Sequence, residues 1–174
     1  LNSPAVRGED LRFSEKGLIE TTRQQLLPLW NALSFFTTYA KIDGWEPNKE
    51  NLSIKKNNPL DVWIISRLQK LIEEVKNEMD NYDLNRSVAP FVGFIDLLTN
   101  WYIRRGRRRF WKAGRGADKL AAYATLYTVV LEFSKVIAPF IPYIADGIYQ
   151  TLRKDDDHKS VHLALFPNLE NNLR

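Results

Sequence analysis

The chain has 174 residues, of which 44% are hydrophobic and 12% aromatic, enough for the buried core of a single domain. It contains no cysteine, which excludes disulfides, thiolate metal sites and a cysteine nucleophile, while a net charge of +4 and a pI near 9.3 favour a polyanionic partner. No apolar run approaches the length of a transmembrane helix and the first residues lack the order of a signal peptide, so we expect a cytoplasmic protein that does not bind membranes.

The first predicted helix covers residues 18–40. Apolar residues recur there at spacings of three and four, the period of one helical face. They are Leu26, Leu29, Leu33, Phe36 and Ala40. Pro28 has no N–H to donate, so we expect a kink or two separate segments at this position. Asp43 and Gly44 end the pattern, and residues 46–58 are expected to form a loop.

Capping residues mark the starts of the next two helices. Asn58 is predicted to cap the second helix, with Pro59 at its first position, where a missing N–H costs nothing. Asp83 is predicted to cap a long third helix over residues 84–112, which carries Pro90 in its early part.

The fourth predicted helix, residues 117–138, is apolar on several faces and is therefore expected at the centre of the fold. A shorter fifth helix is expected over residues 143–154. Helices joined by short connections predict an all-α fold, an antiparallel bundle of four to five helices. We divide the chain into a leading segment (1–17), a helical bundle (18–153) and a loop with an extended tail (154–174).

The sequence NWYIRRGRRRFW, residues 100–111, places five arginines between two tryptophans. Seven positive charges lie within residues 104–115, and no carboxylate occurs between Asp96 and Asp118. At about 100° per residue, Trp101 shares a face with upstream apolar residues, and most of the cations lie within about 80° of the same direction. We therefore expect Trp101 in the core and, beyond it, a helix end that extends past the bundle to meet a partner.

Arginines interleaved with aromatic rings are typical of RNA binding, because guanidinium groups bind phosphate oxygens and unpaired bases stack on flat rings. Trp111 is the ring that we expect to be exposed for stacking. Asn100, Arg107 or polar residues of the 44–58 loop could read base edges, and no feature singles out one of them. The cations predicted to contact RNA phosphates are Arg104, Arg105, Arg108, Arg109, Lys112 and Arg115.

Other interpretations of this cluster stay open. The arginines could pair with carboxylates of neighbouring helices, for which the candidates are Asp61, Glu73, Glu74 and Glu132. Gly106 fits a close approach of either an RNA backbone or a neighbouring helix. A bundle that binds an acidic protein would also carry a basic face, whereas attachment to a membrane surface would need a continuous apolar face that is not found.

No catalytic or metal site is predicted. Residues 114–116, GRG, are too short for a glycine loop that cradles phosphate. His158 and His162 lie close to the acidic run 155–157, but the sequence DDDHK is typical of a solvated turn and not of a metal site. No nucleophile, histidine and acid are paired by any pattern. We therefore predict binding and not catalysis, with no cofactor in this chain.

Several stretches, in their order and spacing, resemble the anticodon-binding helical domain of the isoleucyl-tRNA synthetases, a family of class I aminoacyl-tRNA synthetases. They are LLPLWNALSFFTTYA, NPLDVWIISRLQKLIEEV, FIDLLTNWY, NWYIRRGRRRFW, VIAPFIPYIADGIYQTL and SVHLALFP, and they cover nearly the whole chain. The arginine-rich helix end is most similar to isoleucine enzymes of eukaryote-like type. The valyl and leucyl enzymes share the bundle and are the alternative, with a different sequence at this helix end.

The resemblance implies a fold of the class I anticodon-binding type and a role in holding the anticodon stem and loop of the isoleucine tRNA. Residues 1–17 resemble the segment that follows the catalytic domain and its KMSKS loop, so the remaining catalytic and C-terminal regions of a synthetase are implied as partners. The whole enzyme attaches isoleucine to its tRNA with ATP and magnesium. This chain has no HIGH-like or KMSKS-like sequence, so the chemistry is expected elsewhere in such an enzyme, and a non-catalytic RNA-binding bundle is the other alternative.

Overall fold

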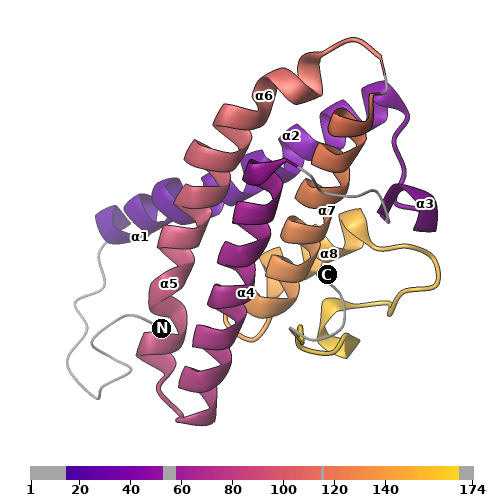
Figure 1. The fold of residues 1–174 in the computed structure, drawn as a ribbon. Helices are drawn as coiled ribbons and strands as arrows, with labels where there is room; N and C mark the ends of the chain where they lie inside the picture. The colour runs from indigo at the N-terminus through magenta and orange to yellow at the C-terminus, as the bar shows by residue number, and fades with distance from the viewer. Residues whose placement is uncertain (1–14, 53–57, 115, 169–174) are drawn as a thin grey trace.

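The computed structural model describes residues 15–52, 58–114 and 116–168, which form an all-α fold without a β-strand (Figure 1). In chain order, the elements are α1 (Glu15–Thr21), η2 (Thr22–Leu26), α2 (Leu27–Asp43), α3 (Lys49–Leu52), α4 (Pro59–Asp80), α5 (Leu84–Asp96), η3 (Leu97–Ile103), α6 (Arg104–Trp111), α7 (Ala117–Ile137), α8 (Pro142–Leu152) and η4 (Val161–Leu163). The predicted all-α helix bundle is confirmed.

The helices α5 and α6 are joined through the π-helical segment η3 into one continuous helix, which runs antiparallel to α4 (Figure 1). The middle of this long helix contacts α2 on one side and α4 on the other, and α6 packs against the start of α7. The basic sequence therefore lies at one end of the bundle, where three other helices meet it.

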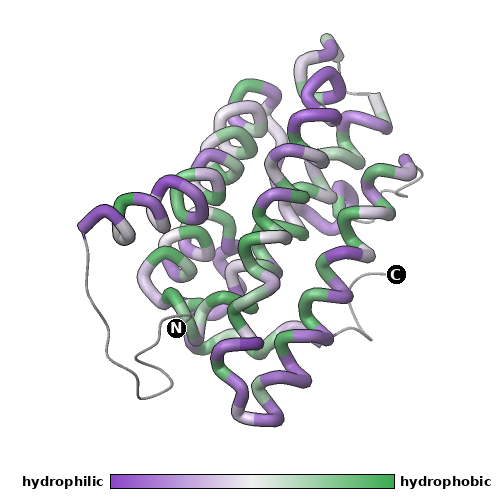
Figure 2. Tube along the Cα trace, turned by 90° about the vertical axis from the view of Figure 1, so that its left-hand side faces the viewer, coloured by the Kyte–Doolittle hydropathy of each residue, from purple (hydrophilic) through white to green (hydrophobic). Residues whose placement is uncertain are grey.

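The central helix is α7, as predicted. Its side chains Tyr123, Leu126 and Phe133 have no solvent exposure. By length and composition α7 could span a membrane, contrary to the expectation that no apolar run approaches that length, but 78% of its most apolar window is buried inside the bundle. A helix surrounded by other helices must be apolar on every face, whereas polar and apolar residues alternate along the outer helices (Figure 2).

Both predicted helix caps are confirmed. The Asn58 side chain accepts a hydrogen bond of 3.0 Å from the backbone N–H of Leu60, and Pro59 is the first residue of α4. The Asp83 side chain accepts one of 3.0 Å from the N–H of Arg86 at the start of α5. Each cap supplies an acceptor to an N–H group that has no partner within its own helix.

The interruption expected at Pro28 takes the form of a π-helical segment. The segment η2 ends at Leu26, α2 begins directly after it at Leu27, and Pro28 lies in the first turn of α2. Because Pro28 cannot donate to a carbonyl of the preceding turn and its ring crowds that turn, the preceding turn widens. Pro90 lies inside α5 without such an interruption.

The second π-helical segment, η3, changes which residues of the long helix are buried. A π-helical turn contains an extra residue, so the side chains after it are rotated by about 100° relative to an uninterrupted α-helix. Tyr102 is fully buried and Ile103 is 6% exposed, whereas Trp101 is 45% exposed. The prediction that Trp101 belongs to the core is therefore wrong, because it assumed an α-helical rotation throughout.

The connections differ in detail from the sequence predictions. A short helix, α3, occupies part of the stretch 46–58 that was expected to be a loop, and residues 53–57 of this stretch lie outside the described residues. Of the predicted leading segment 1–17, only residues 15–17 are described, and they belong to α1.

The tail after α8 is fastened to that helix by Asp146. Its carboxylate accepts hydrogen bonds from the backbone N–H of Val161 (2.9 Å) and from the hydroxyl of Ser160 (2.8 Å). These bonds, that from the Val161 N–H above all, hold the pKa of Asp146 below its ordinary value. Residues 154–174 were predicted to form a loop and an extended tail. The first part of this segment contains η4 and is fastened to α8, and residues 169–174 lie outside the described residues.

Replacing Asp83 with alanine is expected to lower the free energy of unfolding by about 1 kcal/mol, because the Arg86 N–H loses its acceptor. Asp83→Asn retains an acceptor and is expected to keep most of the stability. Urea unfolding followed by circular dichroism measures both, with the exposed acid Asp80 replaced by alanine as the control. Equal stabilities for the Asp83→Ala and Asp80→Ala variants would contradict a stabilising cap.

Candidate nucleic-acid interface

The outer face of α6 and its C-terminal cap carries a dense group of cations. The exposed members are Arg104, Arg105, Arg107, Arg108 and Lys112. The side chains of Arg104, Arg105 and Arg108 form no ion pair or hydrogen bond with any residue that the structure describes. Arg115, which is also predicted to contact RNA, lies outside the described residues. We call this face the arginine face; its charge suits a polyanion.

The opposite face of α6 is packed into the bundle, contrary to the expectation that the helix end extends past it. Gly106 is buried, and a Cβ placed on it would lie 3.9 Å from the Leu60 side chain of α4. Phe110 is 1% exposed, and its ring lies edge-on to Phe35 and to Tyr123 with centroid distances of 5.1 Å. Protein side chains thus occupy the space beside Gly106, which leaves no room there for an RNA backbone.

Arg109 lies on this packed face, which corrects its prediction as a phosphate contact. Its side chain is 10% exposed, and its guanidinium donates hydrogen bonds of 2.7 Å to both carboxylate oxygens of Asp61. Asp61 is fully buried at the start of α4 and accepts a further bond of 2.7 Å from the Tyr102 hydroxyl. Among the carboxylates proposed as partners, Asp61 is therefore the one that pairs, because a buried carboxylate requires a cation beside it.

Asp118, in the first turn of α7, binds the other side of the same guanidinium. It accepts a hydrogen bond of 3.0 Å from Arg109 Nε, and its carboxylate also accepts one of 3.1 Å from the Asn58 amide. Partial burial alone would raise the pKa of Asp118, but the bonds from Arg109 and Asn58 hold it below its ordinary value. Burial would likewise lower the pKa of Arg109, yet the bonds to Asp61 and Asp118 raise it, so this arginine keeps its charge in the interior.

A second buried cation, Lys119, fastens the end of α6 to α2. The Lys119 side chain is 7% exposed, and its ammonium pairs with the Asp43 carboxylate at 2.6 Å. The same ammonium donates a hydrogen bond of 2.9 Å to the backbone carbonyl of Lys112, the residue that caps α6. Tyr123 donates its hydroxyl hydrogen bond to Asp43 as well. The last turn of α6 is therefore held by α4, α7 and α2 together.

Trp111, the ring expected to be available for stacking, is 55% exposed. Its indole N–H donates a hydrogen bond of 2.7 Å to the Tyr39 hydroxyl of α2, which fixes the orientation of the ring. The Arg107 guanidinium carbon lies 5.7 Å from the Trp111 ring centroid and 6.0 Å from that of Phe35. An oriented and exposed indole beside a guanidinium is suited to stacking by an unpaired base.

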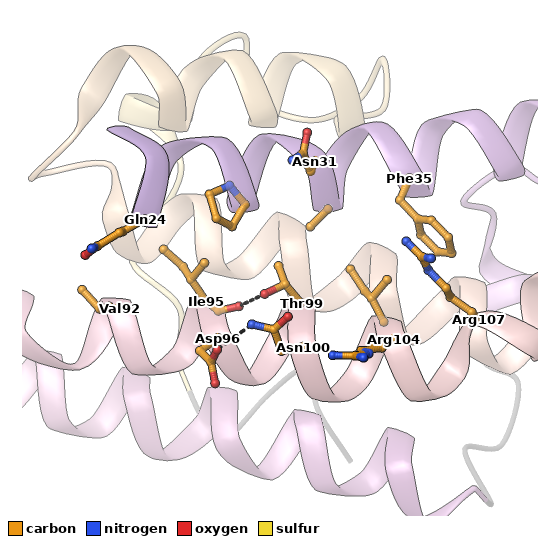
Figure 3. Close-up of a pocket in the computed structure, with 13 residues that line it drawn as sticks. Gln24, Asn31, Phe35, Val92, Ile95, Asp96, Thr99, Asn100, Arg104 and Arg107 are labelled. Carbon is orange, nitrogen blue, oxygen red and sulfur yellow. Dashed lines mark hydrogen bonds between the residues drawn. The ribbon is translucent and has the colours of Figure 1, made fainter. Parts of the chain in front are cut away.

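A groove of about 480 Å³ lies between the long helix and the segments η2 and α2 (Figure 3). The long helix contributes Asn100, Arg104 and Arg107 to its lining, η2 contributes Gln24 and α2 contributes Asn31. Figure 3 shows the Arg107 side chain extending across toward α2. The Asn31 side chain is directed away from the long helix, and the Asn100 amide donates a hydrogen bond of 2.6 Å to Asp96, an acid that also lines the groove (Figure 3). The guanidinium groups of Arg104 and Arg107 are therefore the main donors that the groove offers to base edges.

Trp101 and Arg105 form a further pair, which does not line this groove. The Arg105 guanidinium carbon lies 4.3 Å from the Trp101 ring centroid. The three other arginine–ring contacts among the described residues are longer, between 5.7 and 6.0 Å. Trp101 thus holds a cation at the surface and does not fill the core.

The described residues contain no group of three histidines or acids placed to hold a metal ion. Asp157, next to the first histidine, instead accepts a hydrogen bond of 2.8 Å from the backbone N–H of Lys154. This bond closes a turn, which is the structure that the sequence DDDHK indicates.

The sequence matches a known family of domains. A family model of the anticodon-binding domain of tRNA ligases matches residues 61–174. The matched region begins at the buried carboxylate of Asp61 and contains the whole arginine face. The chain belongs to this family of anticodon-binding domains.

The chain is also similar to isoleucine–tRNA ligases of bacteria. It is 52% identical to that of Protochlamydia amoebophila over 170 residues, which cover 98% of this chain and 16% of the relative. It is 52% identical to that of Chlamydia trachomatis serovar A, over 97% of this chain and 16% of the relative. With the Treponema denticola ligase it shares 43% identity over 100% of this chain and 17% of the relative. The chain spans about one sixth of the length of these relatives, and the predicted resemblance is confirmed.

Two arginines, Arg107 and Arg109, lie in environments that differ from the sequence prediction. Arg109 is directed inward, whereas Arg107, one of several residues named for base reading, is exposed beside the groove. The signal that could have separated them is Asp61, an acid among the apolar residues at the start of the second helix, since a buried charge must be paired. Among the described residues, those of the 44–58 loop do not line the groove.

Arg109→Ala is expected to lower the free energy of unfolding by about 3–5 kcal/mol, because the Asp61 carboxylate would stay buried without its cation. Arg108→Ala removes the adjacent, exposed arginine and is expected to leave the stability nearly unchanged. Urea unfolding of the two variants provides the comparison. If both unfolded at the same urea concentration as the parent chain, the buried pair would have no such role.

Proposed function

We propose that this chain binds the anticodon stem and loop of the isoleucine tRNA as part of an isoleucine–tRNA ligase. The observation that carries the proposal is the arginine face, whose exposed guanidinium groups have no carboxylate partners among the described residues. The family of anticodon-binding domains and the names of the relatives point to the same RNA.

The arginine face binds backbone phosphates of the stem and loop. Arg104 and Arg108 are exposed one helical turn apart, so both can meet one run of phosphates. Each phosphate neutralised releases condensed counterions, which makes the affinity depend on salt concentration. These contacts position the RNA and do not read its sequence.

The groove beside α2 receives unpaired bases of the loop. Its lining offers the guanidinium groups of Arg104 and Arg107 as donors and the amide oxygen of Asn100 as an acceptor to base edges. Trp111 supplies an exposed ring next to the guanidinium of Arg107 for stacking. The groove lies alongside the arginine face, so phosphates and bases of one loop can be bound together.

The ligase chemistry resides in other regions of the same enzyme. Those catalytic and C-terminal regions are the covalent partners of this domain, and the whole ligase uses ATP and magnesium in the cytoplasm to join isoleucine to its tRNA. This domain positions the tRNA and contributes to the selection of the isoleucine tRNA over other tRNAs.

The test is binding of the chain to fluorescently labelled isoleucine tRNA, and to a non-cognate tRNA, over a series of salt concentrations. The double variant Arg104→Ala with Arg108→Ala is expected to raise the Kd by at least about tenfold and to lower the slope of log K against log salt by about two. The Tm is expected to stay close to that of the parent chain, because both side chains are exposed.

The matched control is Arg86→Ala, which removes an arginine with 76% of its side chain exposed from the opposite end of the same long helix. Its Kd and salt slope are expected to equal those of the parent chain. Absence of binding at low salt would contradict the proposal. Displacement of the tRNA by polyglutamate as effectively as by unlabelled tRNA would show a site for acidic partners in general.

A further inference from the structure

The exposed residues of the long helix fall into two lines. Asn100, Arg104, Arg107 and Trp111 follow one another at spacings of four, three and four residues, and the first three line the groove. Trp101, Arg105, Arg108 and Lys112 repeat the same spacing one residue further on, and none of them lines the groove. Residues three and four apart are neighbours on a helix surface, so each line has one tryptophan and at least one arginine held beside it.

In the second line, the position of Arg105 is fixed by a ring. Its guanidinium carbon is 4.3 Å from the centroid of Trp101, a distance at which the cation and the ring attract each other. Trp101 is 45% exposed, so the ring holds the guanidinium at the surface of the domain. An arginine that is already ordered loses less conformational entropy when it binds a ligand.

Among the described residues, none accepts a hydrogen bond from the Arg105 side chain. The guanidinium of Arg109, by contrast, is bound to Asp61 and Asp118. A guanidinium offers a planar fork of N–H donors that matches two oxygens of a phosphate. The Arg105 guanidinium covers the Trp101 ring. A ligand that approaches this pair therefore meets the N–H edge of the guanidinium and not the face of the ring.

We propose that Trp101 and Arg105 form a subsite for one backbone phosphate of the RNA, beside the groove and outside its lining. Trp101 is a positioning residue that holds the guanidinium, and Arg105 contacts the phosphate. The proposal rests on the proposed function and deepens it, because it assigns one phosphate to a single member of the arginine face, Arg105, and identifies the ring that positions it.

The experiment uses a synthetic anticodon stem–loop of the isoleucine tRNA in which single phosphates are replaced, one at a time, by neutral methylphosphonates. The parent chain is expected to lose about tenfold in affinity when the phosphate bound by Arg105 is neutral. The Arg105→Ala variant is expected to bind the unmodified RNA about tenfold more weakly, and to lose nothing further at that same phosphate. Its salt slope is expected to fall by about one.

Three further variants separate positioning from charge. Arg105→Lys keeps the charge and loses the fork of N–H donors, and Trp101→Leu keeps Arg105 but removes the ring. In both variants, neutralising the phosphate bound by Arg105 is expected to reduce the affinity less than it does in the parent chain. At the other phosphates, the loss of affinity is expected to equal that of the parent chain. Arg86→Ala is the control and is expected to reproduce the parent pattern at every phosphate. Thermal unfolding of each variant, expected within a few degrees of the parent, shows that the fold is intact.

Losses of equal size in the parent chain and in Arg105→Ala at every phosphate would overturn the subsite while leaving the proposed function in place. A parent pattern unaltered in Trp101→Leu would overturn the positioning role of the ring. If the parent chain fails to bind the unmodified stem–loop at low salt, the proposed function fails, and the subsite with it.

Discussion

The buried pair between Arg109 and Asp61 determines how the basic helix is presented. A carboxylate without solvent exposure needs a cation and hydrogen bonds to both of its oxygens, and Arg109 with Tyr102 supplies them. The pair fixes the rotation of α6 against α4, and Asp118 fixes the same guanidinium against α7. Once this side of α6 is fastened, the other arginines of the helix are left on the outside.

The widened turn η3 makes this arrangement possible over the length of the helix. Four buried residues, Leu98, Tyr102, Gly106 and Phe110, are spaced by four positions each. In a regular α-helix each such step advances about 40° around the axis, so the buried line would turn steadily away from its neighbours. The extra residue of η3 compensates for part of this rotation. The buried side of the helix therefore contacts α4 at Gly106 and the rings of α2 and α7 at Phe110.

The sequence predicts the helices well because capping, proline placement and apolar periodicity act locally. Asn58 and Asp83 bind N–H groups two or three residues away, so their roles follow from neighbouring letters alone. The exposure of Trp101 could not be predicted, since η3 alters the helical rotation and no residue type marks a π-helical turn. The role of Arg109 depends on Asp61, 48 positions away in the chain, and seven similar cations in one run cannot be told apart until the fold brings that acid to one of them.

The division of the arginines has an electrostatic consequence. Like charges three or four residues apart on a helix repel each other, so Arg104, Arg105 and Arg108 oppose the formation of the helix that carries them. Packing of Phe110 and the interior bonds of Arg109 and Lys119 offset this repulsion from the other side. The repulsion itself is relieved only when counterions or a polyanion approach the outer face. The same helix is therefore held in place by its neutralised side, while its unneutralised side stays open to a polyanion.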